Sequence, residues 1–240
     1  RLTGKYNMRL NSTAEEESSA SSATWRFDYP NGWHTYNQDQ TGNQSWMWKR
    51  SAGLDVVTYD GNSTAGRQIS HSLAGTPEMM WVKIRDHIDG WYVYHKDLNG
   101  GTNPQNYYLR INNSSMEAAT ANFWNNTAPT STHFTVGQDG GINNNGRDYL
   151  AILFRSIPGI SKVGTYSGSG STVQTVNCGF QPRFVIWKNN SRDGEAWYTL
   201  DTLRGWGSGQ DKNLRLGHTA IQTDHNFGAP TSTGFTMSGD

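Results

Sequence analysis

Three consecutive glutamates, Glu15, Glu16 and Glu17, form the densest cluster of groups that could do acid–base chemistry. A glycosidase needs two carboxyl groups that face each other across a cleft, about 5 to 9.5 Å apart. Neighbouring side chains of a strand point to opposite faces, and in a loop they are simply solvated. The cluster therefore favours a solvated surface over a glycan-cleaving site. The sequence predicts a protein that is not an enzyme.

Other polar residues also lack the spacing that catalysis or metal binding requires. Residues 86–89 contain two aspartates and a histidine, but the Asp-Gly pair that follows is typical of a hairpin turn. The seven histidines form no His-Glu-x-x-His pattern, and no Asp-x-Asp-x-Asp-Gly calcium loop occurs. Cys178, the single cysteine, aligns with His71 in the repeat described below, which suits a strand residue better than a nucleophile. We therefore expect no cofactor, no metal ion and no catalytic pair.

Aromatic side chains are the remaining candidates for binding, because the chain contains ten tryptophans. Trp206 lies in the glycine-rich residues 204–209, and Trp33 lies between a glycine and a histidine. Little in either segment could bury such a ring. Exposed rings of this kind stack on sugars or anchor protein interfaces. The sequence leaves both alternatives open.

An internal repeat supplies the elements that would position these residues. Ala-Pro-Thr-Ser-Thr at residues 128–132 recurs 101 residues later, and further matches follow in order with offsets between 101 and 107 residues. The repeating unit is therefore about 105 residues long. Residues 1–50 are the C-terminal part of a first repeat, residues 51–155 a complete second repeat, and residues 156–240 a third repeat that lacks its last strand.

The repeat also sorts the tryptophans. Trp91 and Trp197 recur at the same position, so we expect both in a core. Trp81 and Trp187 fall one position apart on equivalent strands, so their rings point to opposite faces. At least one of these two should face a neighbouring domain, another chain or a ligand. Together with Trp206 and Trp33 they are the candidate interface or glycan contacts.

Short stretches of alternating polar and apolar residues predict the fold class. The second repeat contains about eight such stretches, bounded by Asp-Gly, Asn-Gly-Gly or Gly-Gly turns. Gly, Ser, Thr and Asn make up about two fifths of the chain, a composition that excludes helical bundles and coiled coils. Eight antiparallel strands in one unit is the size of a β-sandwich. The sequence thus predicts an all-β tandem array of antiparallel β-sandwich repeats of jelly-roll or lectin-like type.

Charge and hydropathy exclude two classes of partner. Twenty basic and twenty acidic residues give a net charge of zero, so no overall field attracts nucleic acid or an anionic membrane. The longest wholly apolar run, residues 149–154, is far shorter than the 20 or so residues that span a bilayer. We expect neither nucleic-acid binding nor membrane insertion. A single cysteine excludes an internal disulfide and fits assembly in a cytoplasm.

Several motifs resemble a known repeat family. They are Val-Thr-Tyr-Asp-Gly-Asn-Ser at 57–63, Pro-Glu-Met-Met-Trp-Val-Lys at 77–83, Trp-Tyr-Val-Tyr-His at 91–95 and Phe-Trp-Asn-Asn-Thr-Ala-Pro-Thr-Ser-Thr at 123–132. They look like a family of marine bacteriophage virion and tail-fibre proteins, cyanophages among them, often beside concanavalin A-like lectin domains. The resemblance covers almost all of residues 51–240. It implies a tail fibre, spike or surface decoration on the virion surface, assembled in the host cytoplasm, and no catalytic motif.

The resemblance predicts partners as well. We expect contacts with other virion proteins and with copies of this chain, in a homo-oligomer, and attachment to a host surface glycan. The alternative is an array of lectin-like carbohydrate-binding modules in a secreted or cell-surface protein, which would bind glycans as a monomer. Because the first repeat begins midway and Asp240 aligns near Asp139, we also expect this chain to be a piece of a longer polypeptide.

Overall fold

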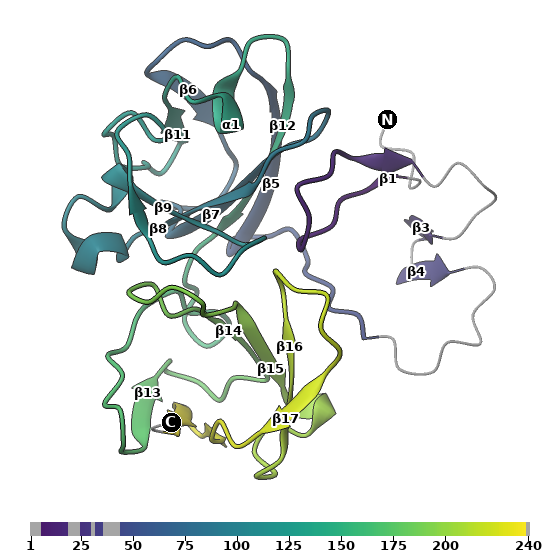
Figure 1. Cartoon of the computed structure of the whole chain (residues 1–240), viewed down its shortest axis with the longest axis vertical. Coiled ribbons are helices and arrows are strands. Elements are labelled where there is room, and N and C mark those ends of the chain that lie inside the picture. The colour runs from purple at the N-terminus through teal and green to yellow at the C-terminus, as the bar shows by residue number, and fades with distance from the viewer. Residues whose placement is uncertain (1–5, 19–24, 30–31, 36–43, 239–240) are drawn as a thin grey trace.

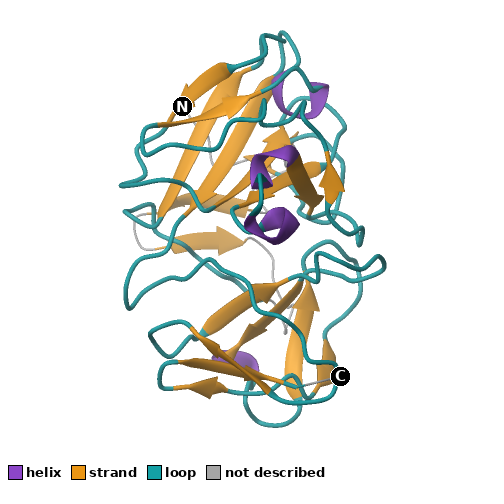
Figure 2. Ribbon diagram, turned by 90° about the vertical axis from the view of Figure 1, so that its left-hand side faces the viewer, coloured by secondary structure: helices purple, strands orange, loops and turns teal. Residues whose placement is uncertain are grey.

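The computed structural model describes residues 6–18, 25–29, 32–35 and 44–238. Antiparallel strands dominate it, and its helices are single turns, so the all-β fold class is confirmed (Figure 2). We refer to residues 1–50, 51–155 and 156–240 as the N-terminal, central and C-terminal parts. None of the helices in the described ranges is long and apolar enough to cross a membrane.

The central part contains a six-stranded sheet with the order β10-β9-β8-β7-β12-β5 (Figure 1). Its strands are β5 (Leu54–Asp60), β7 (Met79–Ile84), β8 (Trp91–His95), β9 (Tyr107–Arg110), β10 (Ala118–Ala119) and β12 (Asp148–Phe154). A small sheet of β6 (Arg67–Ser70) and β11 (His133–Val136) packs on one face. The short helices are η1 (Leu98–Gly101), η2 (Pro104–Asn106) and α1 (Gly140–Asn143).

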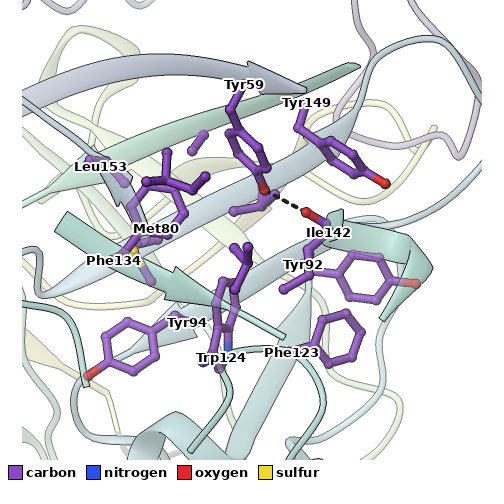
Figure 3. Packing of buried hydrophobic residues seen from close by; sticks show 14 of the residues in the cluster. Tyr59, Met80, Tyr92, Tyr94, Phe123, Trp124, Phe134, Ile142, Tyr149 and Leu153 are labelled. Carbon is purple, nitrogen blue, oxygen red and sulfur yellow. Dashed lines mark hydrogen bonds between the residues drawn. The ribbon is translucent and has the colours of Figure 1, made fainter. Parts of the chain in front are cut away.

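Between these two sheets lies a core rich in aromatic rings (Figure 3). The side chains of Trp124 and Phe134 are fully buried there. The Tyr59 hydroxyl donates to the Ile142 carbonyl at 2.8 Å, so burial leaves this polar group satisfied. Tyr59 and Tyr149 stack with ring centroids 5.1 Å apart. Aromatic area thus replaces the scarce aliphatic residues of the sequence.

The C-terminal part also has two sheets that pack together. The larger has the order β14-β15-β16-β17 and the smaller β13-β19-β18. The elements are β13 (Gln174–Asn177), β14 (Phe184–Trp187), β15 (Tyr198–Asp201), η3 (Thr202–Arg204), β16 (Asp211–Arg215), β17 (Thr223–His225), β18 (Pro230–Thr231) and β19 (Gly234–Met237). Leu200 of the larger sheet and Phe235 of the smaller one share the buried core.

Two short hairpins represent the N-terminal part. One pairs β1 (Tyr6–Asn7) with β2 (Glu17–Ser18), and the other pairs β3 (Trp25–Tyr29) with β4 (Gly32–Thr35). Trp33 lies in β4, but its side chain is outside the described residues.

Strand segments that the sequence repeat aligns with one another are paired in the same register. One set of aligned strand pairs is Tyr6–Ser18, Tyr107–Ala119 and Lys212–Asp224. A second set is Ile69–Phe134 and Val176–Phe235, and a third is Met80–Tyr94 and Val185–Leu200. Because a one-residue slip would turn every side chain to the other face, equal registers mean equivalent faces in these strands.

Candidate interface site

The second face of the six-stranded sheet is a contact surface between the parts. Trp81 alternates with Met80 and Val82 of the first core, so its ring lies on this second face and is only 1% exposed. The cluster around it includes Leu10 of the N-terminal part and Trp197 of the C-terminal part. Residues from all three parts therefore bury this face.

Two tryptophans link neighbouring parts through their indole N–H groups. Trp91 Nε1 donates to the Arg9 carbonyl at 2.9 Å. Trp197 Nε1 donates to the Arg110 carbonyl at 2.8 Å. Both rings are buried, as expected for recurring positions. The second bond thus repeats the first with aligned residues.

Backbone hydrogen bonds repeat in the same way. The Asp89 amide donates to the Thr13 carbonyl at 2.9 Å, and in the matching turn the Gly194 amide donates to the Ser114 carbonyl at 3.1 Å. These bonds connect each hairpin turn to the segment that follows a strand of the preceding part. We call the first set of contacts, between Arg9–Glu16 and Arg85–Trp91, the first junction.

A second pair of backbone bonds runs in the opposite direction. The Glu16 amide donates to the Arg85 carbonyl at 2.6 Å. Its counterpart, the Glu117 amide, donates to the Asn190 carbonyl at 2.8 Å. We call the contacts between residues 110–117 and residues 190–197 the second junction.

The same positions also pair through their side chains. Arg85 donates to Glu16 Oε2 from Nε at 2.9 Å and from Nη2 at 2.7 Å. Asn190 Nδ2 donates to Glu117 Oε2 at 3.1 Å. The expectation that the glutamate cluster is simply solvated is therefore wrong for Glu16, because Arg85 holds it in a partly buried ion pair.

The ends of three aligned segments meet beside the junctions. Asn11 Nδ2 donates to the His218 carbonyl at 3.5 Å, which joins the N-terminal and C-terminal parts. Gly217 packs closely against the backbone of Ile111. A Cβ atom added to Gly217 would lie 2.0 Å from the Ile111 carbonyl oxygen. Only glycine allows this approach without a shift of one backbone.

Trp206 does not have the exposure that its glycine-rich segment suggests. Its ring is 5% exposed and packs on Phe235 at 5.7 Å between centroids, inside the C-terminal core. The loop folds inward because the buried Asp211 carboxylate accepts the Gly207 amide at 2.7 Å and the Phe227 amide at 2.8 Å. The prediction of an exposed ring at Trp206 is wrong for this reason.

Trp187 is half-buried within its own part. It stacks on Tyr198 at 5.2 Å and meets Phe227 edge-on at 5.0 Å. Trp81 and Trp187 therefore do lie on opposite faces, with Trp81 toward the other parts and Trp187 toward its own core.

Each hairpin next to a junction carries a lysine, and Lys83 is buried whereas Lys188 is half-buried. Lys83 Nζ donates to the Ile84 carbonyl at 2.6 Å and the His87 carbonyl at 3.2 Å. Burial lowers the pKa of Lys83 to about 8, although nearby aspartates and Glu15 oppose the shift. Lys188 Nζ donates to a different turn carbonyl, that of Glu195, at 2.6 Å, and burial lowers the pKa of Lys188 too. These ammonium groups hold turns together.

A polar cleft of about 380 Å³ opens where β5 and β12 adjoin. Arg67, Arg85, Asp60 and Asp148 line it, next to the stacked pair of tyrosines. Arg67 donates to the Asp60 carbonyl. Such groups can hydrogen-bond a polar ligand. Among the described residues, no group of three or more His, Cys, Asp or Glu side chains could hold a metal ion.

The fold and its junctions define an all-β protein whose parts are joined by tryptophan-to-carbonyl contacts. A family model described as Domain of unknown function (DUF7483) matches residues 4–236, so the chain belongs to this family. No curated protein matches the chain. No solved structure matches it either.

Proposed function

We propose that the chain is a non-enzymatic virion protein of a bacteriophage, a tail fibre, spike or surface decoration, built from three like β-sandwich units. The observation that carries the proposal is the repetition of the junction, with aligned residues, between successive parts. Repeated junctions make an array in which each unit fixes the orientation of the next. The motifs at residues 57–63 and 91–95 supply the link to phage proteins.

The nature of the contacts supports a structural and adhesive role. Backbone groups, indole N–H groups and apolar surface form the junctions. Large buried surfaces with aromatic anchors are typical of stable assemblies. The proposed partners are other virion proteins, copies of this chain and a host surface glycan, and the proposed location is the virion surface after assembly in the host cytoplasm.

Purified particles of a phage that encodes this chain test the proposal. Mass spectrometry should detect its peptides in particles that survive a density gradient, and antibody fragments against it should label one defined part of the particle. The same fragments should reduce adsorption to host cells if the chain is adhesive. Particles that lack the chain would contradict the proposal.

The polar cleft favours the alternative, an array of carbohydrate-binding modules in a secreted or cell-surface protein. Its arginines and aspartates are groups that hydrogen-bond sugars. A glycan array probed with the chain and with Arg67→Ala separates the two functions. Binding that Arg67→Ala abolishes and the exposed control Arg192→Ala retains would support the alternative.

A further inference from the structure

The C-terminal part carries a third version of the junction surface, and this version has no partner among the described residues. Arg215, Thr219 and Gln222 occupy the positions of Arg110, Ser114 and Glu117. Within the described residues, no indole reaches the Arg215 carbonyl, and the Thr219 carbonyl and Gln222 amide have no hydrogen-bond partner. Arg215 Nε is buried and also has no partner there.

The N-terminal part carries a complementary edge at β1, to which no second strand is paired within the described ranges. Its counterparts β9 and β16 each pair with a hairpin strand, β8 or β15. At the end of these ladders the Ile111 amide donates to the Trp91 carbonyl at 3.2 Å, and the Leu216 amide to the Trp197 carbonyl at 2.9 Å. The matching amide of Leu10 has no partner in the part of the chain that the structure describes.

A single β-hairpin would pair both with the β1 edge and with the third junction surface. In the central and C-terminal parts, one hairpin pairs with the β9-type strand of its own part while its tryptophan reaches the preceding part. The contact between Asn11 and His218 places the β1 segment next to the segment after Arg215. A hairpin on β1 therefore points its tryptophan toward the C-terminal part.

We propose that a β-hairpin of the β7–β8 type, with an Asp-Gly-Trp-Tyr turn, adds to the free edge of β1 and donates its indole N–H to the Arg215 carbonyl. The three parts then form a closed ring with three like junctions. The partner is a further hairpin of this repeat family. The inference rests on the three like units of the proposed function.

The chemistry of the third surface also restricts the partner. Gln222 stands where the other junctions have Glu16 and Glu117, so the third junction needs no cation at the position of Arg85. Ile221 is 86% exposed beside it and offers apolar surface. Strand addition to an open edge obtains affinity from the backbone and specificity from such side-chain positions.

A head-to-tail cyclised peptide with the sequence of residues 77–96 serves as the probe, after NMR has shown that it forms the hairpin. Titrated into the intact chain, it should bind saturably and slow hydrogen exchange at the amides of Leu10 and Gln222 by about tenfold or more. The peptide contains two tryptophans, and replacing the one that corresponds to Trp91 by phenylalanine removes the indole donor and should weaken binding about fivefold to tenfold.

Matched variants of the chain locate the site. Gln222→Pro removes the backbone donor and should weaken peptide binding, whereas Gln222→Ala keeps that donor and should bind normally. The absence of saturable binding, protection at other amides only, or an unchanged affinity of the phenylalanine peptide would overturn the inference. Particle labelling is independent of this result, so failure here and failure of the proposed function are distinguishable.

Discussion

The sheets of the central and C-terminal parts share a register but differ in what flanks them. β7 lies between β8 and β12, and five of its six side chains are buried. β14 pairs in the same register with β15, but within the described residues no strand covers its other edge, and all four of its side chains are half-buried. Strands β7 and β14 therefore have the same pairing register but different burial. The presence or absence of a second neighbouring strand determines how much of each strand is exposed to water.

Aromatic rings cover the start of β14 on the face of the sheet that points away from the C-terminal core. Trp46 and Trp48 lie against Phe184 with centroids 5.2 and 6.0 Å away. Trp46 Nε1 also donates to the buried Asp201 carboxylate at 3.3 Å. These contacts bury part of one face of β14, but among the described residues they do not replace the neighbouring strand that β7 has in β12.

The largest expected difference between the two sheets comes from their tryptophans. Trp81→Ala removes a fully buried ring and should lower the free energy of unfolding by about 4 kcal/mol. Trp187→Ala removes a half-buried ring and should cost about 2 kcal/mol. Urea denaturation followed by circular dichroism measures both values. Equal costs would contradict the contrast in burial.

A pH dependence should distinguish the lysines of the two sheets. Below pH 8 Lys83 is charged in the folded state, which opposes folding because burial lowers its pKa from 10.5 to about 8. Between pH 8 and pH 10.5 this lysine is protonated in the unfolded state but not in the folded state. The free energy of unfolding therefore rises with pH over this range. Relative to Lys83→Met, the free energy of unfolding of the wild-type chain should rise by about 3 kcal/mol from pH 8 to pH 10.5, measured by urea denaturation at each pH.

Lys188→Met is the matched control, since Lys188 is only half-buried. The difference in free energy of unfolding between Lys188→Met and the wild-type chain should change less over the same pH range. If this difference does not change with pH for either variant, burial does not lower the pKa of either lysine, and the prediction is wrong.

The close approach at Gly217 predicts a smaller loss. Gly217→Ala places a methyl group 2.0 Å from the Ile111 carbonyl oxygen, so a backbone must move, at a cost of about 2 kcal/mol. Gly168→Ala is the control, because no atom lies within 4 Å of its Cβ position. It should change the midpoint of thermal unfolding little, and an equal shift for both variants would contradict the contact.

The smallest expected effect tests the two junctions against each other. Trp91→Phe and Trp197→Phe each remove one indole donor and leave a carbonyl unpaired, at a cost of about 1.5 kcal/mol. The two costs should agree within experimental error in chemical denaturation. A loss at one position and none at the other would mean that the junctions are not equivalent.

Sequence alternation predicted the all-β class because the pleat of a strand imposes its period directly on the residues. Strand β12, for example, contains the apolar run of residues 149–154, which is too short for any element but a strand between turns. The burial of Trp206 could not be read in this way, since it depends on Asp211 and Phe235, which only the folded chain brings to the loop.

The role of Glu16 was also hidden, because its partner Arg85 lies 69 residues away. One signal was present: Arg9 and Glu16 recur as Arg110 and Glu117. Residues that recur outside the apolar core can mark the contacts between units, but only the structure shows that the arginine acts through its carbonyl.

The Arg85–Glu16 pair gives the two junctions different responses to ionic strength. Salt screens charges over about 8 Å at physiological concentration, and it weakens exposed pairs more than buried ones. At the second junction Asn190 replaces the arginine, and the Glu117 carboxylate accepts from two neutral donors, Asn190 Nδ2 and the Asn99 amide. Concentrated salt should therefore loosen the first junction before the second, so the order in which the parts separate depends on the medium around the chain.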